Sequence, residues 1–223
     1  MSENNSLIQF QRIGTGLSFI LFPLLFVFAF AVHPGLLSPR LLGPEELILR
    51  AHQNGLLQFA HVLVTLSTVL LVVIAIHFMK LLERSSAAWA GMIGAAVAIL
   101  GAVILAADKG ALCLTMSALD TLPENEFALM MPGLLAMFSF KGWLVILWGI
   151  LFLPIGFAIQ AIALLKTKVF PRWGSILFLI GALLVGFPDG AEIINLTASV
   201  LMAAALVPYG IKIIKNKVQK VTA

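Results

Sequence analysis

Polar side chains recur along one face of an apolar segment near residue 60. Asn54, Gln58, His61, Thr65 and Thr68 follow one another at spacings of four, three, four and three residues, which place them on one side of a helix. An amide or imidazole facing lipid without a partner would cost several kcal/mol. The spacing therefore predicts that this polar stripe faces other helices or a water-filled recess, although threonines can also bond their own helix backbone.

Acid–base chemistry is the first reaction that these residues could perform. His61 near Asp108 or Glu192 could form a proton relay or a general base, because an imidazole beside a carboxylate titrates near neutral pH. The same pairing could instead only lock two helices together. The candidate catalytic residues are therefore His61, Asp108 and Glu192.

Further polar residues are predicted near the depth of His61, counted from the ends of the apolar segments. Lys109 and Lys141 could hold an anionic headgroup or a carboxylate, and a turn at 188–190 could carry Asp189 below the membrane surface. The candidate ligand-binding residues are Asn54, Gln58, Thr65, Lys109, Lys141 and Asp189. Charges also collect at the ends of apolar segments without any site, which is the simpler explanation for Lys109 and Lys141.

Haem binding is a second chemical hypothesis, with the cofactor left unknown. His33 and His61 are predicted at similar depth on different helices and could be the axial ligands of one haem. No metal site is predicted, because no histidine pair has i, i+3 or i, i+4 spacing and no H-E-x-x-H motif occurs. Cys113 is the single cysteine and excludes an internal disulfide.

The composition is that of a polytopic membrane protein. Of 223 residues, 61% are hydrophobic and 11% are charged, with a mean hydropathy of +1.08, whereas a soluble domain carries about 25% charged residues. The net charge of +4 does not indicate nucleic-acid binding, because the basic residues lie at segment ends, where they orient the chain in a membrane.

Six apolar runs are long enough to suggest membrane-spanning helices, which need about 20 residues. No internal repeat or linker divides the chain, so residues 1–223 form one domain. We expect an all-α bundle of six transmembrane helices with two short outer interfacial helices, one starting at Gly43-Pro44 and one over 120–131 that ends at Pro132-Gly133. The predicted spans are 13–32, 62–79, 87–107, 143–165, 173–187 and 191–211.

The distribution of basic residues predicts the orientation. With the N-terminus inside the cell, ten Lys and Arg residues lie on the inner side and four on the outer side, so both termini are predicted in the cytoplasm of a multi-pass cell-membrane protein. The alternative for the first run is a cleaved secretory signal, since Arg12 precedes it and Ala29-Phe30-Ala31 has the A-x-A form.

Small residues predict how the third run packs. Gly91, Ala95, Ala98 and Ala102 form a face that allows close helix contact. This face could pack within the bundle or join a second copy. Pro23 and Pro154 lie mid-span, where each removes a backbone hydrogen bond and is expected to bend its helix.

Two short motifs carry a resemblance to a known class of proteins. Val169-Phe170-Pro171-Arg172-Trp173-Gly174-Ser175-Ile176-Leu177 and Arg12-Ile13-Gly14-Thr15-Gly16-Leu17 resemble segments of uncharacterised bacterial integral membrane proteins with six or seven helices. The resemblance covers under a tenth of the chain. It implies a bacterial inner membrane and assigns no functional residue.

The leading functional hypothesis is an outward-facing polar recess that binds, and could act on, a small-molecule or lipid-like ligand. The alternatives are a small transporter or transporter subunit, a structural subunit of a membrane complex, and a haem-binding membrane protein. Whether the protein is an enzyme is left open. A binding site should end blindly near Thr68, whereas a transporter should have polar lining that continues beyond that depth.

Overall fold

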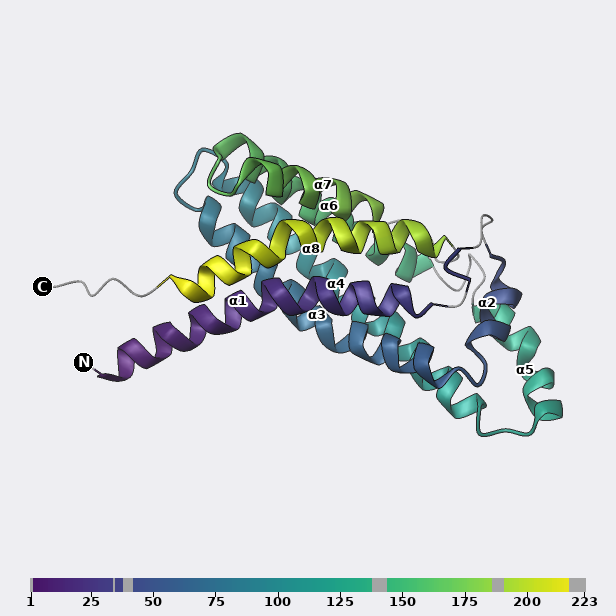
Figure 1. Ribbon diagram of the computed structural model, residues 1–223. Helices are drawn as coiled ribbons and strands as arrows, with labels where there is room; N and C mark the ends of the chain where they lie inside the picture. Colours follow the sequence, from purple (N-terminus) through teal and green to yellow (C-terminus); the bar gives the residue numbers. More distant parts are fainter. Residues whose placement is uncertain (1, 34, 38–41, 138–143, 186–190, 217–223) are drawn as a thin grey trace, which may run out of the picture.

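The described part of the chain is helical throughout. In the computed structural model (Figure 1), the structure describes residues 2–33, 35–37, 42–137, 144–185 and 191–216. These residues contain eight helices, which confirms the predicted all-α class, and each of the six apolar runs overlaps a different helix. The helices are α1 (Ser2–Ala31), α2 (Pro44–Ala51), α3 (Gly55–Leu82), α4 (Ala88–Leu119), α5 (Glu124–Met137), α6 (Leu144–Thr167), α7 (Arg172–Leu184) and α8 (Glu192–Lys215).

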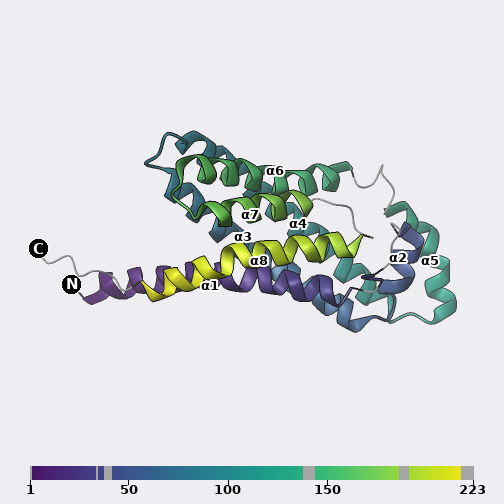
Figure 2. The ribbon, with the colours of Figure 1, turned by 45° about the horizontal axis from the view of Figure 1, so that its top comes forward.

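Six of the helices form a closed ring of neighbours. Going round it, α1 packs on α3, α3 on α4, α4 on α6, α6 on α7, α7 on α8, and α8 on α1. Figure 2 shows α6, α7, α8 and α1 in this order, with α3 and α4 behind them. The start of α1 and the end of α8 lie at the same end of the ring (Figure 1), where Arg12 donates a hydrogen bond to the carbonyl oxygen of Asn216.

The short helices α2 and α5 pack together at the opposite end of the ring (Figure 1). Gly43 is the N-cap of α2, Pro44 begins the helix and two acidic residues follow in its first turn, where the helix dipole favours negative charge. The two short helices share a small apolar core with the ends of α3 and α4. It comprises Ile48, Ala51, Leu57, Met116, Phe127 and Leu134.

One predicted helix end is wrong. α5 does not end at Pro132-Gly133 but continues to Met137. Leu134, which follows this dipeptide, is buried in the small apolar core, and its packing offsets the backbone hydrogen bond that the proline removes. α4 continues beyond the predicted span 87–107 to Leu119. Asp108 therefore lies about 17 Å before the end of its helix.

Four helices in the described residues are long and apolar enough to cross a membrane. They are Gly55–Leu82, Ala88–Leu119, Glu192–Lys215 and the Ser6–Ala31 part of α1. The shorter apolar stretches are Leu151–Thr167 of α6 and Arg172–Leu184 of α7. The 13 residues of α7 rise only about 20 Å, so this helix by itself is shorter than the apolar core of a bilayer.

Small residues let α4 and α6 approach closely. A Cβ atom added to Gly101 would lie 2.6 Å from the Cα atom of Leu153, and one added to Gly156 would lie 2.7 Å from the carbonyl oxygen of Gly94. Ala95, Ala98 and Ala102 are buried on the same helix. The small-residue face of 91–102 is therefore covered within the chain, and a contact with a second copy stays a prediction.

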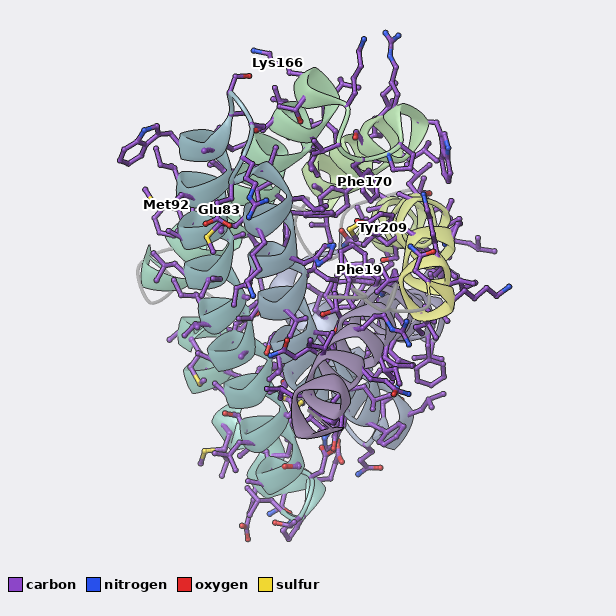
Figure 3. All side chains as sticks on the ribbon, turned by 90° about the vertical axis from the view of Figure 1, so that its left-hand side faces the viewer. Phe19, Glu83, Met92, Lys166, Phe170 and Tyr209 are labelled. Carbon is purple, nitrogen blue, oxygen red and sulfur yellow. The ribbon has the colours of Figure 1, made fainter. Side chains whose placement is uncertain are left out.

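Aromatic residues fill the core near the end where α1 begins. The ring centroid of Phe19 lies 5.3 Å from those of Phe78 and Tyr209. Figure 3 shows Phe19, Phe170 and Tyr209 close together. The His77 ring packs 5.2 Å from that of Phe19 and lies 3.2 Å from the Tyr209 hydroxyl. The half-buried His77 ring is thus part of this aromatic packing.

Basic residues gather at the end of the ring where α1 begins and α8 ends. The C-terminal turns of α3, α6 and α8 and the start of α7 lie at this end. Arg50 and Lys109 are the described basic residues outside this group. The residues of the basic end are Arg12, Lys80, Arg84, Lys166, Lys168, Arg172, Lys212 and Lys215.

Candidate functional site

The polar stripe of α3 lies at the edge of the buried face of this helix, beside α4. Thr68 is buried, and the other four members of the stripe are half-buried. The neighbouring side of the helix is apolar and exposed, at 53% for Phe59, 66% for Leu66 and 64% for Val69. The amide and imidazole groups are thus partly shielded from the surface that would meet lipid.

The first two residues of the stripe have structural partners. Asn54 is the N-cap of α3, because its side chain accepts a hydrogen bond from the backbone N–H of Leu57 at 3.1 Å. Gln58 donates a hydrogen bond from Nε2 to Asp120. Both interactions explain these residues without a ligand, although both residues were predicted to bind one.

The two threonines of the stripe bond their own helix. Thr65 Oγ1 donates to the carbonyl oxygen of His61 at 3.0 Å, and Thr68 Oγ1 donates to that of Thr65 at 2.7 Å. Such back-bonding is the ordinary way for a threonine to satisfy its hydroxyl inside a membrane helix. The threonines therefore provide little evidence for a ligand, and the imidazole of His61 is the chemically distinctive group of the stripe.

A histidine–carboxylate cluster, defined here as His33, His61 and Glu192, forms where three helices meet. His33 follows α1, His61 lies in the second turn of α3, and Glu192 begins α8. His33 Nδ1 lies 3.4 Å from Glu192 Oε1, and the side chains are 10% and 0% exposed. The rings of His33 and His61 lie 5.9 Å apart at 46°. His33 thus contacts both of the other two residues, and the predicted pairing of His61 with a carboxylate stays a prediction.

A second polar face runs along α8 from this cluster. Glu192, Asn195 and Ser199 are all buried, with exposed fractions of 2% or less, and Asn195 Oδ1 accepts no hydrogen bond from any described residue. The next buried residues, Met202 and Leu206, are apolar. Sequence reasoning missed Asn195 and Ser199, although their spacing of three and then four residues from Glu192 was a usable signal.

Gln160 is another buried polar residue that the sequence analysis missed. It is fully buried in α6 and donates from Nε2 to the carbonyl oxygens of Ala75 at 2.9 Å and Gly91 at 3.2 Å. These bonds connect α6 to α3 and α4. A lone glutamine in an apolar run of 24 helical residues could have been recognised as such a helix-to-helix contact.

Asp108 and Lys109 form a separate pair on α4. Lys109 Nζ lies 3.4 Å from Asp108 Oδ2, with side chains that are 13% and 5% exposed. A Cβ atom added to neighbouring Gly110 would lie 3.8 Å from Thr65 Cγ2, so this part of α4 packs beside the middle of the polar stripe. The pairing of Asp108 with His61 stays a prediction.

Two predicted ligand contacts, Lys141 and Asp189, lie outside the described residues. The haem hypothesis stays a prediction for His33 and His61, and an absorption spectrum of the purified protein near the Soret band would test it. Within the part of the chain that the structure describes, no three His, Cys, Asp or Glu side chains are grouped as a metal ion would require.

A second histidine network connects α2 to α5 outside the apolar spans. His52 Nδ1 lies 2.6 Å from Asp120 Oδ1 and His52 Nε2 lies 3.2 Å from Glu124 Oε2, while the imidazole stacks on Phe127 at 3.6 Å. Burial acts to lower the pKa of His52, but the hydrogen bonds and negative charges of Glu124 and Asp120 outweigh it and raise this pKa above 6.5. Protonated His52 can donate to both carboxylates.

We expect the His52 network to stabilise the protein in a pH-dependent way. Because the folded-state pKa of His52 is raised, its contribution is fully present below about pH 6.5 and is lost as the pH rises through the raised pKa. At pH 6, His52→Gln should lower the free energy of unfolding by about 1–2 kcal/mol, mostly because the hydrogen bond to half-enclosed Asp120 is weakened. Thermal unfolding of the wild-type and His52→Gln proteins from about pH 5.5 to 9 measures this pH dependence. A stability difference between the two proteins that stayed constant over this range would contradict the prediction.

The fold and the inward polar faces together define a class. Four candidate spans with polar residues turned inward indicate a multi-pass integral membrane protein built of helices. The chain matches no protein-family model, no curated protein and no solved structure.

Proposed function

We propose that the protein binds a small polar or lipid-like molecule at the histidine–carboxylate cluster, in the half of the bundle opposite its basic end. The observation that carries this proposal is the position of His33 against both Glu192 and His61. Ionisable side chains inside a membrane helix bundle are costly, and they commonly mark a substrate site or a proton pathway. Three of them from three helices are more than helix packing requires.

The extent of the polar faces favours a binding site over a transport route. On α3 the stripe ends at Thr68, and the next buried residues are Leu71, Ile74 and Ala75. On α8 the polar face ends at Ser199. Both faces therefore stop inside the bundle, as expected for a site that is open at one end. A transporter would need a polar route continuing toward the basic end, whereas the polar groups found there, Gln160 and His77, are bonded to neighbouring helices.

The orientation and the number of spans are part of the same proposal. The eight described basic residues at one end favour that end as cytoplasmic, which places both termini inside the cell and the cluster toward the outer surface. The return of the chain to its starting end suits six crossings, with α6 and α7 as the two shorter ones. The resemblance to bacterial membrane proteins supports a bacterial inner membrane as the location.

The cluster could also perform acid–base chemistry on its ligand. His61 is half-buried and would carry the proton, while His33 and Glu192 would set its charge and orientation. Asp108 and Lys109, beside the middle of the stripe, would contact the more deeply inserted part of the ligand. Lys141 and Asp189 remain predicted contacts on the same side.

A comparison of co-purified molecules tests the proposed site. The wild-type protein, His61→Gln and the control His77→Gln are purified in mild detergent and extracted, and the extracts are compared by mass spectrometry. We expect one compound, at about one copy per protein, with wild type and the His77→Gln protein and at least about tenfold less with the His61→Gln protein. No such compound with any of the three, or equal amounts with all three, would contradict the proposal.

A further inference from the structure

A pocket lies at the basic end of the bundle, far along α3 from the histidine–carboxylate cluster. It has a volume of about 390 Å³, which is within the usual range for ligand pockets. The last turn of α3 and the first turns of α4 form its walls. Figure 3 shows Glu83 and Met92 on this part of the surface. The lining residues are Met79, Lys80, Glu83, Ala88, Trp89 and Met92.

The charged groups of this pocket are available to a ligand. Lys80 and Glu83 are both exposed, and neither forms an ion pair with another described residue. They lie three residues apart at the end of α3, so they occupy neighbouring positions on one side of the helix. The pocket therefore presents one ammonium group and one carboxylate to the same volume.

Apolar side chains make up the rest of the pocket. Met79, Ala88 and Met92 line it, and Trp89 stands beside it with 74% of its surface exposed. Tryptophan is enriched at the level of lipid headgroups, where its ring and N–H suit the boundary between apolar tails and water. The basic residues at this end of the bundle indicate the same level. A molecule bound here would have its charged part at Lys80 and Glu83 and its apolar part along the methionines.

We propose that this pocket binds a zwitterionic phospholipid whose headgroup ends in a primary ammonium group. The phosphate lies against Lys80, the ammonium donates hydrogen bonds to Glu83 and faces the Trp89 ring, and an acyl chain follows Met79 and Met92. The site rests on the chain spanning a membrane but not on any ligand at the histidine–carboxylate cluster. Its failure and that of the proposed function are therefore distinguishable.

The carboxylate of Glu83 decides between headgroups. An anionic lipid such as phosphatidylglycerol has no positive charge to offset Glu83. Phosphatidylcholine has a positive charge, but its quaternary ammonium has no N–H to donate. Phosphatidylethanolamine supplies both the phosphate for Lys80 and the N–H donors for Glu83, so we expect it to be preferred over both.

Native mass spectrometry of the full chain with defined lipids tests this site. The protein is delipidated in detergent and mixed with equal amounts of phosphatidylethanolamine, phosphatidylcholine and phosphatidylglycerol of the same acyl composition. We expect phosphatidylethanolamine to be bound about threefold more than either of the others. Glu83→Gln should remove this preference over phosphatidylcholine, and Lys80→Gln should reduce binding of all three lipids.

Two matched controls separate this pocket from general effects of charge. Glu45→Gln removes an exposed carboxylate from α2, and Lys212→Gln removes an exposed ammonium from the end of α8; both should keep the wild-type lipid ratio. Soluble glycerophosphoethanolamine lacks the acyl chains and should not displace the lipid at equal concentration. Equal binding of the three lipids by the wild type, a preference for phosphatidylglycerol, displacement by the soluble headgroup, or loss of preference in Glu45→Gln would overturn the proposal.

Discussion

Replacing Gly156 by alanine is expected to separate α6 from α4 and to lower the free energy of unfolding by about 3 kcal/mol or more. The added methyl group would lie 2.7 Å from both the Cα atom of Ala98 and the carbonyl oxygen of Gly94. These are backbone atoms of α4, so no side-chain rotation can make room. Close packing of this kind is the main source of stability between helices in lipid.

Gly14→Ala is the matched control, because nothing lies within 4 Å of a Cβ atom added at Gly14. This change should be neutral or slightly stabilising, since alanine favours a helix more than glycine does by about 1 kcal/mol. Thermal unfolding and the fraction of monodisperse protein after purification in detergent measure both variants. Equal stability of the two variants would mean that α4 and α6 do not pack as described.

Removing the imidazole of His33 is also expected to lower the free energy of unfolding strongly. Its Nδ1 atom lies 3.4 Å from Oε1 of Glu192, whose side chain is fully buried. The loss of one partner beside a buried carboxyl group costs about 2–3 kcal/mol. His33→Ala is therefore expected to destabilise the protein by this amount and to disturb the position of the His61 ring, which packs 5.9 Å from it.

A double-mutant cycle isolates the contribution of the contact between His33 and Glu192. Unfolding is measured for His33→Ala, Glu192→Gln and the double variant, and the coupling energy should be about 1–2 kcal/mol. Ile193→Ala, which truncates an exposed neighbour of Glu192, should change stability by about 0.5 kcal/mol or less. Additive effects of the two cluster substitutions would show that the residues do not act together.

Hydropathy and spacing predicted much of the fold. Each apolar run corresponds to one helix of the ring, and Pro44 with two acidic residues correctly predicted the start of α2. Periodicity also separated the half-buried polar stripe of α3 from its exposed apolar side, because the two occupy different sides of one helix. These are local features, and each depends only on residues within a few helical turns.

The contacts that each side chain and each helix makes could not be predicted in the same way. Nothing near Asn54 distinguishes a ligand contact from an N-cap until the start of α3 is known. Which face α6 covers, and hence whether Gly156 meets Ala98, depends on packing between distant segments. The length of α4 could not be predicted from hydropathy either, since the helix continues past the charged pair Asp108 and Lys109 to Leu119.

The orientation of the α3 stripe can be measured directly with spin labels in a bilayer. On a Cys113→Ser background, Thr65→Cys and Leu66→Cys each receive one nitroxide, and collision with dissolved oxygen reports contact with lipid. Leu66 is 66% exposed, whereas Thr65 is half-buried beside α4, so the label at 66 should collide with oxygen several times more often than that at 65. Equal collision rates, or a higher rate at 65, would contradict the buried polar face on which the proposed binding site depends.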